Sequence, residues 1–460
     1  MNSKTSESSS APSFFIATLG CKVNQYESHA LREAWLGRGL CETQEPGRAG
    51  IILVNSCAVT AKAASDVRAT VRRLHRAAPE AAIVISGCAA EVLEQELAGL
   101  PGVRAVVGQS GKAGLLEARF GKADLLAGLP ISGAIPGAKP TVYPPFAVSG
   151  YDRSRAVLKI QDGCSHGCAY CIVPLARGGG RSRAYGEAAE EAVRLLRAGF
   201  REIVISGVNL RQYRDTEDDF WDFLSRLGAA LASEWGGRAR LRISSLEPGQ
   251  LGGRALEVLR ACTMLAPHLH LSLQSGSPSV LRRMGRGHYD PALLPEFFTA
   301  LQQIWPVYGL GADILTGFPG ESEAEFAQGL ELCESLPLTY AHVFPYSRRP
   351  GTKAASMADQ VAPQVKKSRA ARLRALAGGK KERFLHSLLD LPRLQVVFEE
   401  REGQVGEPLC GVSEFYTECT LTGSSAGPYD TLALREIVAV RPVAVQKGRL
   451  IVEPMHDEKG

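Results

Sequence analysis

The sequence predicts an α/β protein with an N-terminal parallel α/β domain, a central partial (β/α)6 barrel and a small C-terminal β-barrel. Three observations favour this fold class. Apolar runs alternate with helical stretches in two long segments, a proline-rich stretch separates these segments, and short β runs fill the end of the chain. The length of 460 residues suits about three domains of roughly 150 residues each.

The N-terminal domain is expected over residues 13–125. Apolar runs typical of buried parallel strands lie at Phe14–Leu19, Ile51–Asn55, Ala82–Ser86 and Val103–Val107. Stretches of helical composition separate them at Asn24–Leu36, Ala61–Arg76 and Ala90–Leu97. This alternation predicts a parallel sheet covered by helices.

A linker over residues 126–149 follows, because prolines and glycines punctuate this stretch. Residues 150–363 then show a second series of strands alternating with helices. Its strand candidates are Ala156–Ile160, Glu202–Ser206, Arg240–Ser244, His268–Gln274, Leu310–Leu315 and Tyr340–Phe344. Six such units in about 200 residues suit a partial barrel.

Residues 364–387 are expected to form a basic helical linker. The stretch 364–384 has eight lysines and arginines against one glutamate, a charge of +7, while the whole chain carries +5. Such a helix is usually a solvated face, and nucleic-acid binding becomes the better interpretation only if neighbouring domains agree. Residues 388–456 show short β runs at Leu394–Glu399, Glu418–Thr422, Arg435–Val440 and Leu450–Val452, which predict a small β-barrel.

The composition excludes several classes of protein. With 45% hydrophobic and 22% charged residues, the chain is neither mostly disordered nor collagen-like. No apolar run approaches the ~18 residues that span a bilayer, and the polar start from Met1 to Ser13 lacks a signal-peptide core. We therefore expect a cytoplasmic protein without membrane association. Eleven cysteines in a reducing compartment favour metal or catalytic roles over disulfides.

The sharpest motif is a loop with the spacing Cys-x3-Cys-x2-Cys, formed by Cys164, Cys168 and Cys171. Three thiolates on one tight loop can hold three irons of a [4Fe–4S] cluster, which leaves the fourth iron open. That iron can bind S-adenosyl-L-methionine, which one electron cleaves to a 5′-deoxyadenosyl radical. A zinc site or three unrelated buried thiols are the alternatives, but zinc sites usually use Cys-x2-Cys pairs and four ligands. Gly163 and Gly167 would let the loop wrap a cluster closely.

Residues near the predicted barrel strand ends are candidates for cofactor binding. They are Gly207, Ser244, Gln274 and Asp313, together with Tyr170, which lies within the cysteine loop and could pack against adenine. Each strand-end residue could equally cap the next helix. The arginines and glycines over 177–183 could approach an anionic ligand or form a flexible basic loop.

A second set of thiols is dispersed in the sequence. Cys21, Cys57 and Cys88 each follow one of the first three predicted strands. Because the carboxyl ends of parallel strands converge on one crevice, we expect these cysteines to meet and to form a second three-thiolate [4Fe–4S] site. The alternative is three buried core thiols. The other thiols are interpreted as structural or incidental: Cys41, Cys262, Cys333, Cys410 and Cys419.

Taken together, these motifs resemble those of the methylthiotransferases, a branch of the radical S-adenosylmethionine enzymes whose C-terminal β-barrel is of the TRAM type. The segment around the first cysteine resembles the branch that acts on N6-threonylcarbamoyladenosine in tRNA. It reads Thr18-Leu19-Gly20-Cys21-Lys22-Val23-Asn24-Gln25-Tyr26-Glu27-Ser28. The segment His342–Thr352 resembles the same branch. Asn55-Ser56-Cys57 departs from the usual Asn-Thr-Cys but keeps a hydroxyl.

The resemblance implies that Cys164, Cys168 and Cys171 bind the catalytic, radical-generating cluster and that Cys21, Cys57 and Cys88 bind an auxiliary cluster. It further implies that the C2 hydrogen of the modified adenosine at position 37 of tRNA, in the anticodon loop, is replaced by a methylthio group. S-adenosyl-L-methionine would serve as both radical source and methyl donor. The implied partners are tRNA, a reductant protein and a sulfur donor, and the basic segment 364–384 would then contact tRNA phosphates.

Three alternatives remain at this point. Two lie within the same family, namely a methylthiotransferase for N6-isopentenyladenosine-37 tRNA or for an aspartate of a ribosomal protein. The third is a non-catalytic iron–sulfur protein that binds RNA. Turnover of S-adenosylmethionine would separate the enzymes from the binding protein.

Overall fold

The computed structural model describes residues 12–118, 140–399, 409–422 and 434–455. The chain forms two compact units, Met1–Val148 with Ile172–Gly179, and Ser149–Cys171 with Gly180–Gly460. The predicted polar start and most of the predicted linker over 126–149 lie outside the described residues. Among the described residues, no helix combines the length and the apolar character that crossing a bilayer requires.

The first unit is built on a parallel five-stranded sheet in the order β2-β1-β3-β4-β5. Four strands lie where the apolar runs predicted them, whereas β2 is too short to carry a recognisable pattern. The strands are β1 (Ser13–Thr18), β2 (Cys41–Glu42), β3 (Ile51–Ser56), β4 (Ala82–Gly87) and β5 (Val103–Val107).

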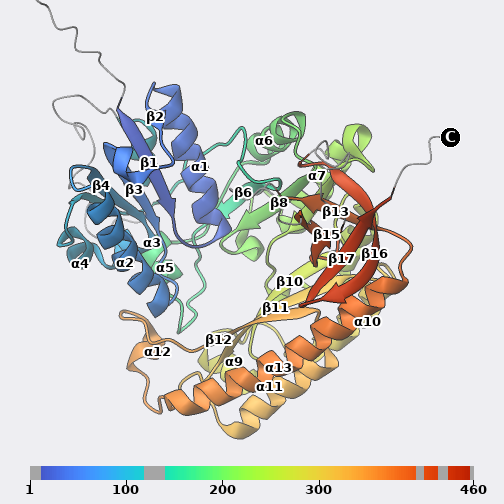
Figure 1. Ribbon diagram of the computed structural model, residues 1–460. Coiled ribbons are helices and arrows are strands. Elements are labelled where there is room, and N and C mark those ends of the chain that lie inside the picture. Colours follow the sequence, from blue (N-terminus) through green and yellow to red (C-terminus); the bar gives the residue numbers. More distant parts are fainter. Residues whose placement is uncertain (1–11, 119–139, 400–408, 423–433, 456–460) are drawn as a thin grey trace, which may run out of the picture. The chain divides into compact units, whose positions relative to one another are not determined.

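Helices cover both faces of this sheet (Figure 1). On one face, α2 (Ala61–Ala77) packs its apolar residues against alternate residues of β3 and β4, such as Ile52 and Ile83. On the other face, Trp35 of α1 (Lys22–Gly37) meets Phe14 of β1 edge-on, with ring centroids 5.2 Å apart. Burial on both faces explains why the strands consist of continuous apolar runs.

Short helices complete the first unit. The single helix predicted over Ala90–Leu97 is instead two helices, α3 (Cys88–Val92) and α4 (Glu94–Ala98), which meet at Leu93. The 3-10 helices are η1 (Pro46–Arg48) and η2 (Lys112–Leu116). A last helix, α5 (Val173–Arg177), comes from the segment Ile172–Gly179, which follows the cysteine loop in sequence but belongs to the first unit. The sequence did not indicate this return of the chain.

The second unit contains the six predicted parallel strands in two sheets, ordered β7-β6-β8-β9 and β10-β11-β12, in which β7 is an additional short strand that pairs antiparallel with β6. Isolated parallel bridges, including one between Leu246 and Leu271, connect the two sheets. The strands are β6 (Ala156–Asp162), β7 (Arg181–Ser182), β8 (Glu202–Gly207), β9 (Arg240–Ile243), β10 (His268–Gln274), β11 (Gly309–Thr316) and β12 (Tyr340–Pro345). This arrangement confirms the predicted α/β barrel class.

Helices follow these strands as the alternation predicted. Two of them begin with a capping box, at Asp219 before α7 and at Ser322 before α11, where the side chain and the third helical residue satisfy each other's backbone groups. The helices are α6 (Tyr185–Arg197), α7 (Phe220–Trp235), α8 (Gly253–Ala261), α9 (Pro278–Arg283), α10 (Leu294–Gln302), α11 (Glu323–Ser335) and α12 (Lys353–Ser356), with 3-10 helices η3 (Leu210–Gln212), η4 (Pro248–Gln250) and η5 (Pro291–Leu293).

The C-terminal strands form a closed barrel in the order β13-β14-β15-β17-β16. They are β13 (Leu394–Phe398), β14 (Cys410–Ser413), β15 (Glu418–Leu421), β16 (Ile437–Gln446) and β17 (Arg449–Pro454). Arg240 and Arg242 of β9 anchor this barrel, because both bind the buried Glu202 carboxylate and donate to backbone carbonyls of the barrel. Burial opposes ionisation of Glu202, but the two guanidinium groups hold its pKa well below the ordinary value.

The basic segment is a single helix, α13 (Pro363–Ser387), followed by η6 (Leu388–Asp390). It lies beside α11 in the second unit (Figure 1). Part of its charge is used within the protein, because Arg369 and Arg372 pair with Glu323, and Arg374 donates to the Val343 carbonyl. Because several cations of α13 are bound within the protein, fewer are available to a ligand than the sequence count suggests.

Candidate functional site

The cysteine loop of the second unit begins at the end of β6. The Asp162 carboxylate accepts hydrogen bonds from Lys159 Nζ at 3.1 Å and from the Gly163 amide at 2.8 Å. Gly163 has a φ of +67°, a left-handed conformation that glycine adopts without strain. Gly163 therefore shapes the start of this loop, and the wrapping of the loop around a cluster stays a prediction.

Polar groups contact two of the loop thiols. Asn209 Nδ2 lies 3.5 Å from Cys164 Sγ, and the His166 amide donates to the same sulfur at 3.4 Å. Arg286 Nη1 lies 3.8 Å from Cys168 Sγ. Burial raises the pKa of Cys168, and the Arg286 charge opposes this rise. These contacts favour thiolates, the form in which cysteine binds a metal.

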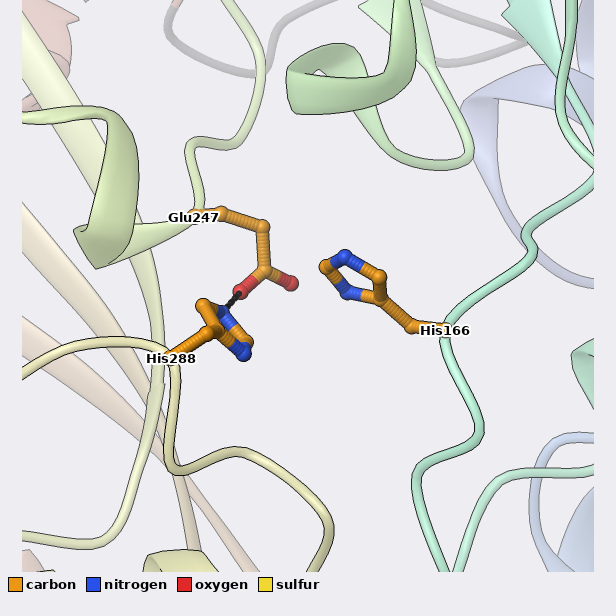
Figure 2. Close-up of side chains that lie close together, drawn as sticks. All are labelled: His166, Glu247 and His288. Carbon is orange, nitrogen blue, oxygen red and sulfur yellow. Dashed lines mark ion pairs between the residues drawn. The ribbon is translucent and has the colours of Figure 1, made fainter.

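His166 of the cysteine loop points toward Glu247 and His288, as Figure 2 shows. Among the described residues, they are the one group of His, Cys, Asp or Glu side chains gathered closely enough to hold a single ion, with ligand atoms within 4.8 Å of one another. His288 Nε2 lies 3.5 Å from Glu247 Oε2, and the two histidine rings lie 4.9 Å apart.

Arg286 makes this group of side chains unfavourable for binding a metal cation. Its guanidinium donates to both oxygens of Glu247, at 3.1 and 2.5 Å, and holds the pKa of Glu247 below its ordinary value together with His288, although burial works in the opposite direction. A cation bound by Glu247 would face this fixed positive charge. We therefore interpret the group as a polar lining that positions Arg286 beside Cys168.

The residues fit a cluster better than a single zinc ion. A tetrahedral zinc site would bring its sulfurs within roughly 4 Å of one another, given Zn–S distances of about 2.3 Å. Among the described residues, neither set of three thiols is gathered for a single ion in this way. In addition, the buried Arg286 Nε has no hydrogen-bond partner in the described part of the chain. Three thiols beside an unsatisfied cationic donor suit a [4Fe–4S] cluster with an anionic ligand.

The five residues predicted to bind a cofactor lie on different elements of the second unit. Gly207 ends β8 so tightly that an added Cβ would lie 2.9 Å from Gln161 Cβ. Tyr170 is half-buried and packs against an apolar cluster that includes Phe318. Ser244 follows β9, Gln274 ends β10 with a φ of +62°, and Asp313 of β11 pairs with His270 at 3.1 Å. Their role toward S-adenosylmethionine stays a prediction.

The arginines over 177–183 do not form the free basic loop that the sequence suggested. Arg181 pairs with Asp162, and Arg183 pairs with Glu191, both at 3.1 Å. Arg177 binds a carboxylate in the first unit, as described below. All three side chains are buried, so an anionic ligand would have to compete with these carboxylates.

Aromatic rings line one face of the β10-β11-β12 sheet. Alternate residues of β10 and β12 share this face with Asp313 of β11, since the register pairs Gly311 with Tyr340 and Asp313 with His342. We call the set the aromatic face: His268, His270, Tyr340, His342 and Phe344. Its rings form a chain of contacts, with centroids 5.6 Å apart for His270 and Tyr340 and 6.3 Å apart for His342 and Phe344.

Gly311 makes room for the rings in the middle of this face. A Cβ at Gly311 would collide with the Tyr340 ring and lie 2.5 Å from His270 Nδ1. At one end of the aromatic face, Tyr416 of the C-terminal barrel stacks on His268 at 4.6 Å, with the Arg242 guanidinium 5.3 Å from the Tyr416 ring. At the other end, His342 and Phe344 are exposed.

The dispersed cysteines lie at the carboxyl ends of neighbouring strands in the first unit. Cys21 caps α1, Cys57 follows β3 and Cys88 begins α3 directly after β4. A Cβ at Gly20 would lie 2.7 Å from Cys57 Cβ, so the residue before Cys21 contacts Cys57. The pKa of Cys57 is raised to about 11, chiefly by burial, and Cys88 and Cys21 contribute to this rise. This mutual influence of the three thiols agrees with the predicted convergence.

A buried polar network lies against these thiols. Arg177 donates to Glu27 Oε1 and to Asn24 Oδ1, both at 2.8 Å. Lys112 Nζ binds Glu27 as well, and it donates to Asn55 Oδ1 at 2.8 Å. Asn24 in turn donates to the carbonyls of Leu19 and Ser56, which lie close to the cysteines in sequence. We call Glu27, Lys112 and Arg177 the charged network.

Hydroxyl and amide groups complete the surroundings of the dispersed thiols. The Ser56 hydroxyl donates to the Ser86 carbonyl at 2.5 Å, so serine performs a bonding role that a threonine could also perform. Gln109 Nε2 lies 3.7 Å from Cys88 Sγ. Every strand end of this crevice is therefore fixed by a side-chain bond as well as by the sheet.

Two family models and several known proteins match this chain. The model of the uncharacterized protein family UPF0004 matches residues 13–108, and the radical SAM superfamily matches residues 158–333. The threonylcarbamoyladenosine tRNA methylthiotransferase MtaB of Bacillus subtilis is 34% identical over 88% of this chain and 90% of the relative. The tRNA-2-methylthio-N(6)-dimethylallyladenosine synthase of Agrobacterium fabrum is 31% identical over 97% of this chain and 98% of the relative.

The chain belongs to the tRNA methylthiotransferases of the radical SAM superfamily. It is therefore an enzyme, and the superfamily implies S-adenosylmethionine and one [4Fe–4S] cluster as its cofactors. Among solved structures, the radical S-adenosylmethionine methyltransferase TsrM of Kitasatospora setae matches with a TM-score of 0.56 and 14% identity, over 75% of this chain and 77% of that chain. This likeness supports the fold alone.

Sequence reasoning missed several side chains of this methylthiotransferase. Arg286, Glu247 and His288 reach the loop thiols from different segments, and no spacing rule connects them with Cys168. The His-x-His alternation in β10 and the Tyr-x-His-x-Phe alternation in β12 were a usable signal for the aromatic face, because period two places such residues on one side of a strand. Lys112 and Glu27 carried no signal of their own.

Proposed function

We propose that this methylthiotransferase replaces the C2 hydrogen of N6-threonylcarbamoyladenosine at position 37 of tRNA with a methylthio group. The observation that carries this proposal is the combination, in one chain, of a loop thiol set with a second thiol set at neighbouring strand ends. When bound, the cofactors supply a 5′-deoxyadenosyl radical and a methyl group. An aromatic C–H bond has no acidic proton, so hydrogen abstraction by a carbon radical suits the reaction better than general acid–base catalysis.

In this proposal, the loop thiols hold the radical-generating cluster. Asn209 and Arg286 orient and stabilise the thiolates of Cys164 and Cys168 by donating to their sulfurs. Glu247 fixes Arg286 through both of its oxygens. The unsatisfied Arg286 Nε is a suitable donor for a carboxylate, such as that of the methionyl group.

The dispersed thiols of Cys21, Cys57 and Cys88 hold the second cluster in this proposal. Its open iron would carry the sulfur that becomes the methylthio group. The position of all three cysteines at one edge of the sheet supports this assignment, as does the tight packing of Gly20 against Cys57.

The aromatic face is the proposed contact surface for unpaired bases of the anticodon loop. Aromatic side chains bind single-stranded nucleic acid by stacking, with about 1–3 kcal/mol per base, and this suits a base that is turned out of its stack. Phe344 is 42% exposed at the open end of the face. Exposed Lys367 and Arg383 of α13 supply cations in the same unit for phosphate contacts.

The polar groups of the aromatic face favour the threonylcarbamoyl substrate over a dimethylallyl one. Two relatives that are named as dimethylallyladenosine synthases are 31–32% identical to this chain, so that substrate is the second candidate. A prenyl group on this face would lie against the His270–Asp313 pair, and burying these polar groups under hydrocarbon is unfavourable. A carbamoyl or carboxylate group could bond to them instead.

Mass spectrometry of nucleosides from total tRNA, with and without this protein, tests the proposal. We expect 2-methylthio-N6-threonylcarbamoyladenosine to disappear without the protein and its unthiolated parent to accumulate. A change in the isopentenyl derivative instead would support the second candidate. If neither nucleoside changes, the proposed tRNA substrate is wrong. Purified enzyme should form 5′-deoxyadenosine during turnover, and its absence would contradict the radical reaction.

A binding measurement tests the aromatic face separately. Phe344→Ala should weaken binding of an unmodified anticodon stem-loop about tenfold, because a stacking partner is lost. Leu293→Ala is the matched control, since Leu293 is also an exposed apolar residue of the second unit, at 62%. Equal affinities of the two variants would argue against base stacking at Phe344.

A further inference from the structure

We propose that Tyr416 of the C-terminal barrel positions the polar groups of the aromatic face that recognise the threonylcarbamoyl group. It acts through Tyr340, whose hydroxyl bonds to His270, the partner of Asp313. The inference deepens the proposed function and rests on it, because it requires that the aromatic face receives this group. The C-terminal barrel then helps to select the nucleoside that the enzyme accepts.

The turn that carries Tyr416 has a defined conformation. Tyr416 lies between β14 and β15 with a φ of +65°, in the left-handed region that tyrosine rarely adopts. The Tyr416 amide donates to the Ser413 carbonyl at 3.0 Å. The Ser413 hydroxyl accepts hydrogen bonds from the amides of Phe415 and Thr417, both at 3.2 Å. A strained residue of this kind persists because its surroundings determine its conformation.

Buried arginines hold this turn against the partial barrel. Arg242 of β9 donates to the Glu414 carbonyl at 2.9 Å. Arg240 of the same strand donates to the Val412 carbonyl at 3.2 Å. Both guanidinium groups bind the Glu202 carboxylate, and all three charged side chains are at most 5% exposed. The turn is therefore fixed beside the first residues of β9.

The ring of Tyr416 lies among other rings and guanidinium groups. The His268 ring stacks on it with centroids 4.6 Å apart, and the Tyr340 ring lies 5.6 Å away. The guanidinium groups of Arg242 and Arg155 lie 5.3 and 5.8 Å from its centre. Because the turn is fixed, the Tyr416 ring restricts where the rings of His268 and Tyr340 can lie.

Two glycines of β11 allow side chains of β10 and β12 to meet across this strand. The register places Gly309 beside His268, and Gly311 beside both His270 and Tyr340. A Cβ at Gly309 would lie 3.1 Å from His268 Cδ2, and a Cβ at Gly311 would collide with the Tyr340 ring. Tyr340 can therefore reach histidines that are two strands away.

Hydrogen bonds join these side chains in a row. The Tyr340 hydroxyl lies 2.9 Å from His268 Nε2 and 2.9 Å from His270 Nδ1, and His270 Nε2 lies 3.1 Å from Asp313 Oδ1. When His270 is neutral, its Nε2–H donates to the carboxylate, so its Nδ1 accepts the Tyr340 hydroxyl proton. The Tyr340 oxygen is then free to accept from His268 Nε2. This row fixes the orientation and the tautomer of His270.

The row runs from a closed end to an open end. His268, which contacts Tyr416, is 2% exposed. The His270 side chain is 11% exposed and the Asp313 side chain is 30% exposed. A substrate group can therefore reach Asp313 and the edge of His270, whereas the end that sets their orientation is covered by the C-terminal barrel.

A purely structural role of Tyr416 is the competing explanation, and ring and hydroxyl variants separate the two. Tyr416→Leu removes the ring, Tyr416→Phe keeps it, and Tyr340→Phe removes only the hydroxyl that joins the histidines. Tyr185→Leu is the matched control, since Tyr185 of α6 also lies under a guanidinium group, that of Arg226 at 3.9 Å.

The experiment measures binding by the full, anaerobically reconstituted protein without a reductant, so that no turnover occurs. Two anticodon stem-loops are compared, one with N6-threonylcarbamoyladenosine and one with adenosine at position 37. The measured quantity is the ratio of their dissociation constants. Loss of folded protein lowers both apparent affinities equally and leaves this ratio unchanged. Iron content and circular dichroism are recorded for every variant.

We expect the parent to prefer the modified stem-loop. Tyr416→Leu and Tyr340→Phe should each reduce this preference about tenfold, as the loss of one positioned hydrogen bond implies, whereas Tyr416→Phe and Tyr185→Leu should stay within about twofold of the parent. The double variant Tyr416→Leu/Tyr340→Phe should lose no more than the larger single effect, because both changes act through His270.

Three results would overturn the inference and leave the proposed substrate in place. They are an unchanged preference in Tyr416→Leu, an unchanged preference in Tyr340→Phe, and additive losses in the double variant. If Tyr416→Leu does not fold, the two phenylalanine variants decide, because Tyr340→Phe must lose the preference and Tyr416→Phe must keep it. A parent that binds both stem-loops equally would instead contradict the proposed substrate, and the inference would fall with it.

Discussion

The two thiol sets differ in how the chain brings them together. Cys164, Cys168 and Cys171 share one short loop, which begins with the left-handed turn at Gly163. Cys21, Cys57 and Cys88 are spread over the first unit and lie at the carboxyl ends of three neighbouring parallel strands. The first arrangement depends on local spacing, and the second depends on the formation of a whole sheet.

The charges around the two sets differ as well. Beside the loop set, Arg286 is matched by Glu247 in a bidentate pair. In the first unit, Arg177 and Lys112 both bind the Glu27 carboxylate, and Arg177 also donates to Asn24. A buried arginine therefore contacts a thiol of the loop set directly, at 3.8 Å from Cys168 Sγ, whereas the buried cations of the first unit are bound by Glu27 and by asparagine side chains.

The largest expected effects come from removing one thiol of each set. Cys168→Ala should abolish both 5′-deoxyadenosine and methylthiolated product, by at least about a thousandfold, because the radical source is lost. Cys57→Ala should abolish the product to a similar extent but retain 5′-deoxyadenosine formation. Each change should lower the iron content by about half, from about eight to about four per chain. Liquid chromatography with mass spectrometry and an iron assay measure these quantities.

Cys41→Ala is the control for both variants, since Cys41 is an exposed thiol of β2 outside the two sets. It should keep full iron content and activity. Loss of 5′-deoxyadenosine in Cys57→Ala would show that the two sets do not have separate roles.

Stability provides a second test of the comparison. Arg286→Ala should destabilise the cluster-free protein by about 3–5 kcal/mol, because the buried Glu247 carboxylate loses the guanidinium that binds both of its oxygens. Arg177→Ala should cost less, because Lys112 still binds the Glu27 carboxylate. Arg441→Ala should cost less than about 1 kcal/mol, since its pair with Glu453 is exposed. Urea unfolding followed by circular dichroism measures the differences. Equal losses at Arg177 and Arg286 would contradict the compensation by Lys112.

The pH dependence of the Glu247–Arg286 pair sharpens the contrast further. The folded protein holds the pKa of Glu247 below the ordinary value of about 4.5, because His288 and Arg286 outweigh the effect of burial, so the folded state binds fewer protons at this group than the unfolded state. The stabilisation is present above about pH 4.5 and is lost as the pH falls through the lower folded pKa. Glu247→Gln should therefore be less stable than the parent at pH 7, and the difference should shrink toward pH 3. A constant difference would show that packing, not charge, explains the loss.

The smallest expected effects concern single donors to sulfur. Asn209→Ala and Gln109→Ala each remove one amide contact, with Cys164 and with Cys88 respectively. Each should leave the iron content unchanged and disfavour reduction of its own cluster by a few-fold, because a weak hydrogen bond to sulfur is lost. Redox titration followed by EPR, in chains that retain one thiol set, would detect this. An effect of Asn209→Ala on the dispersed set would contradict the separation of the two sites.

How much could be predicted from the sequence also depends on whether the residues are close together in the chain. The loop thiols were predictable because their spacing is local, and the dispersed thiols because a buried parallel strand leaves a clear apolar run before each of them. The role of Arg286 could not be predicted, since its partners Glu247 and Cys168 come from other loops. The joint at Leu93 escaped prediction because two short helices and one longer helix have the same composition. The basic segment was correctly predicted as helical, but ion pairs such as Arg369 with Glu321 cannot be counted from charge alone.

The return of Ile172–Gly179 to the first unit has a consequence for recombination between related genes. A single crossover near residue 149 would pair the first unit of one parent with the α5 segment of another. Such a chimera would combine Glu27 and Asn24 from one lineage with Arg177 from the other, and the match between them would depend on both parents having the same network. An exchange that keeps these contacts therefore needs breakpoints on both sides of α5.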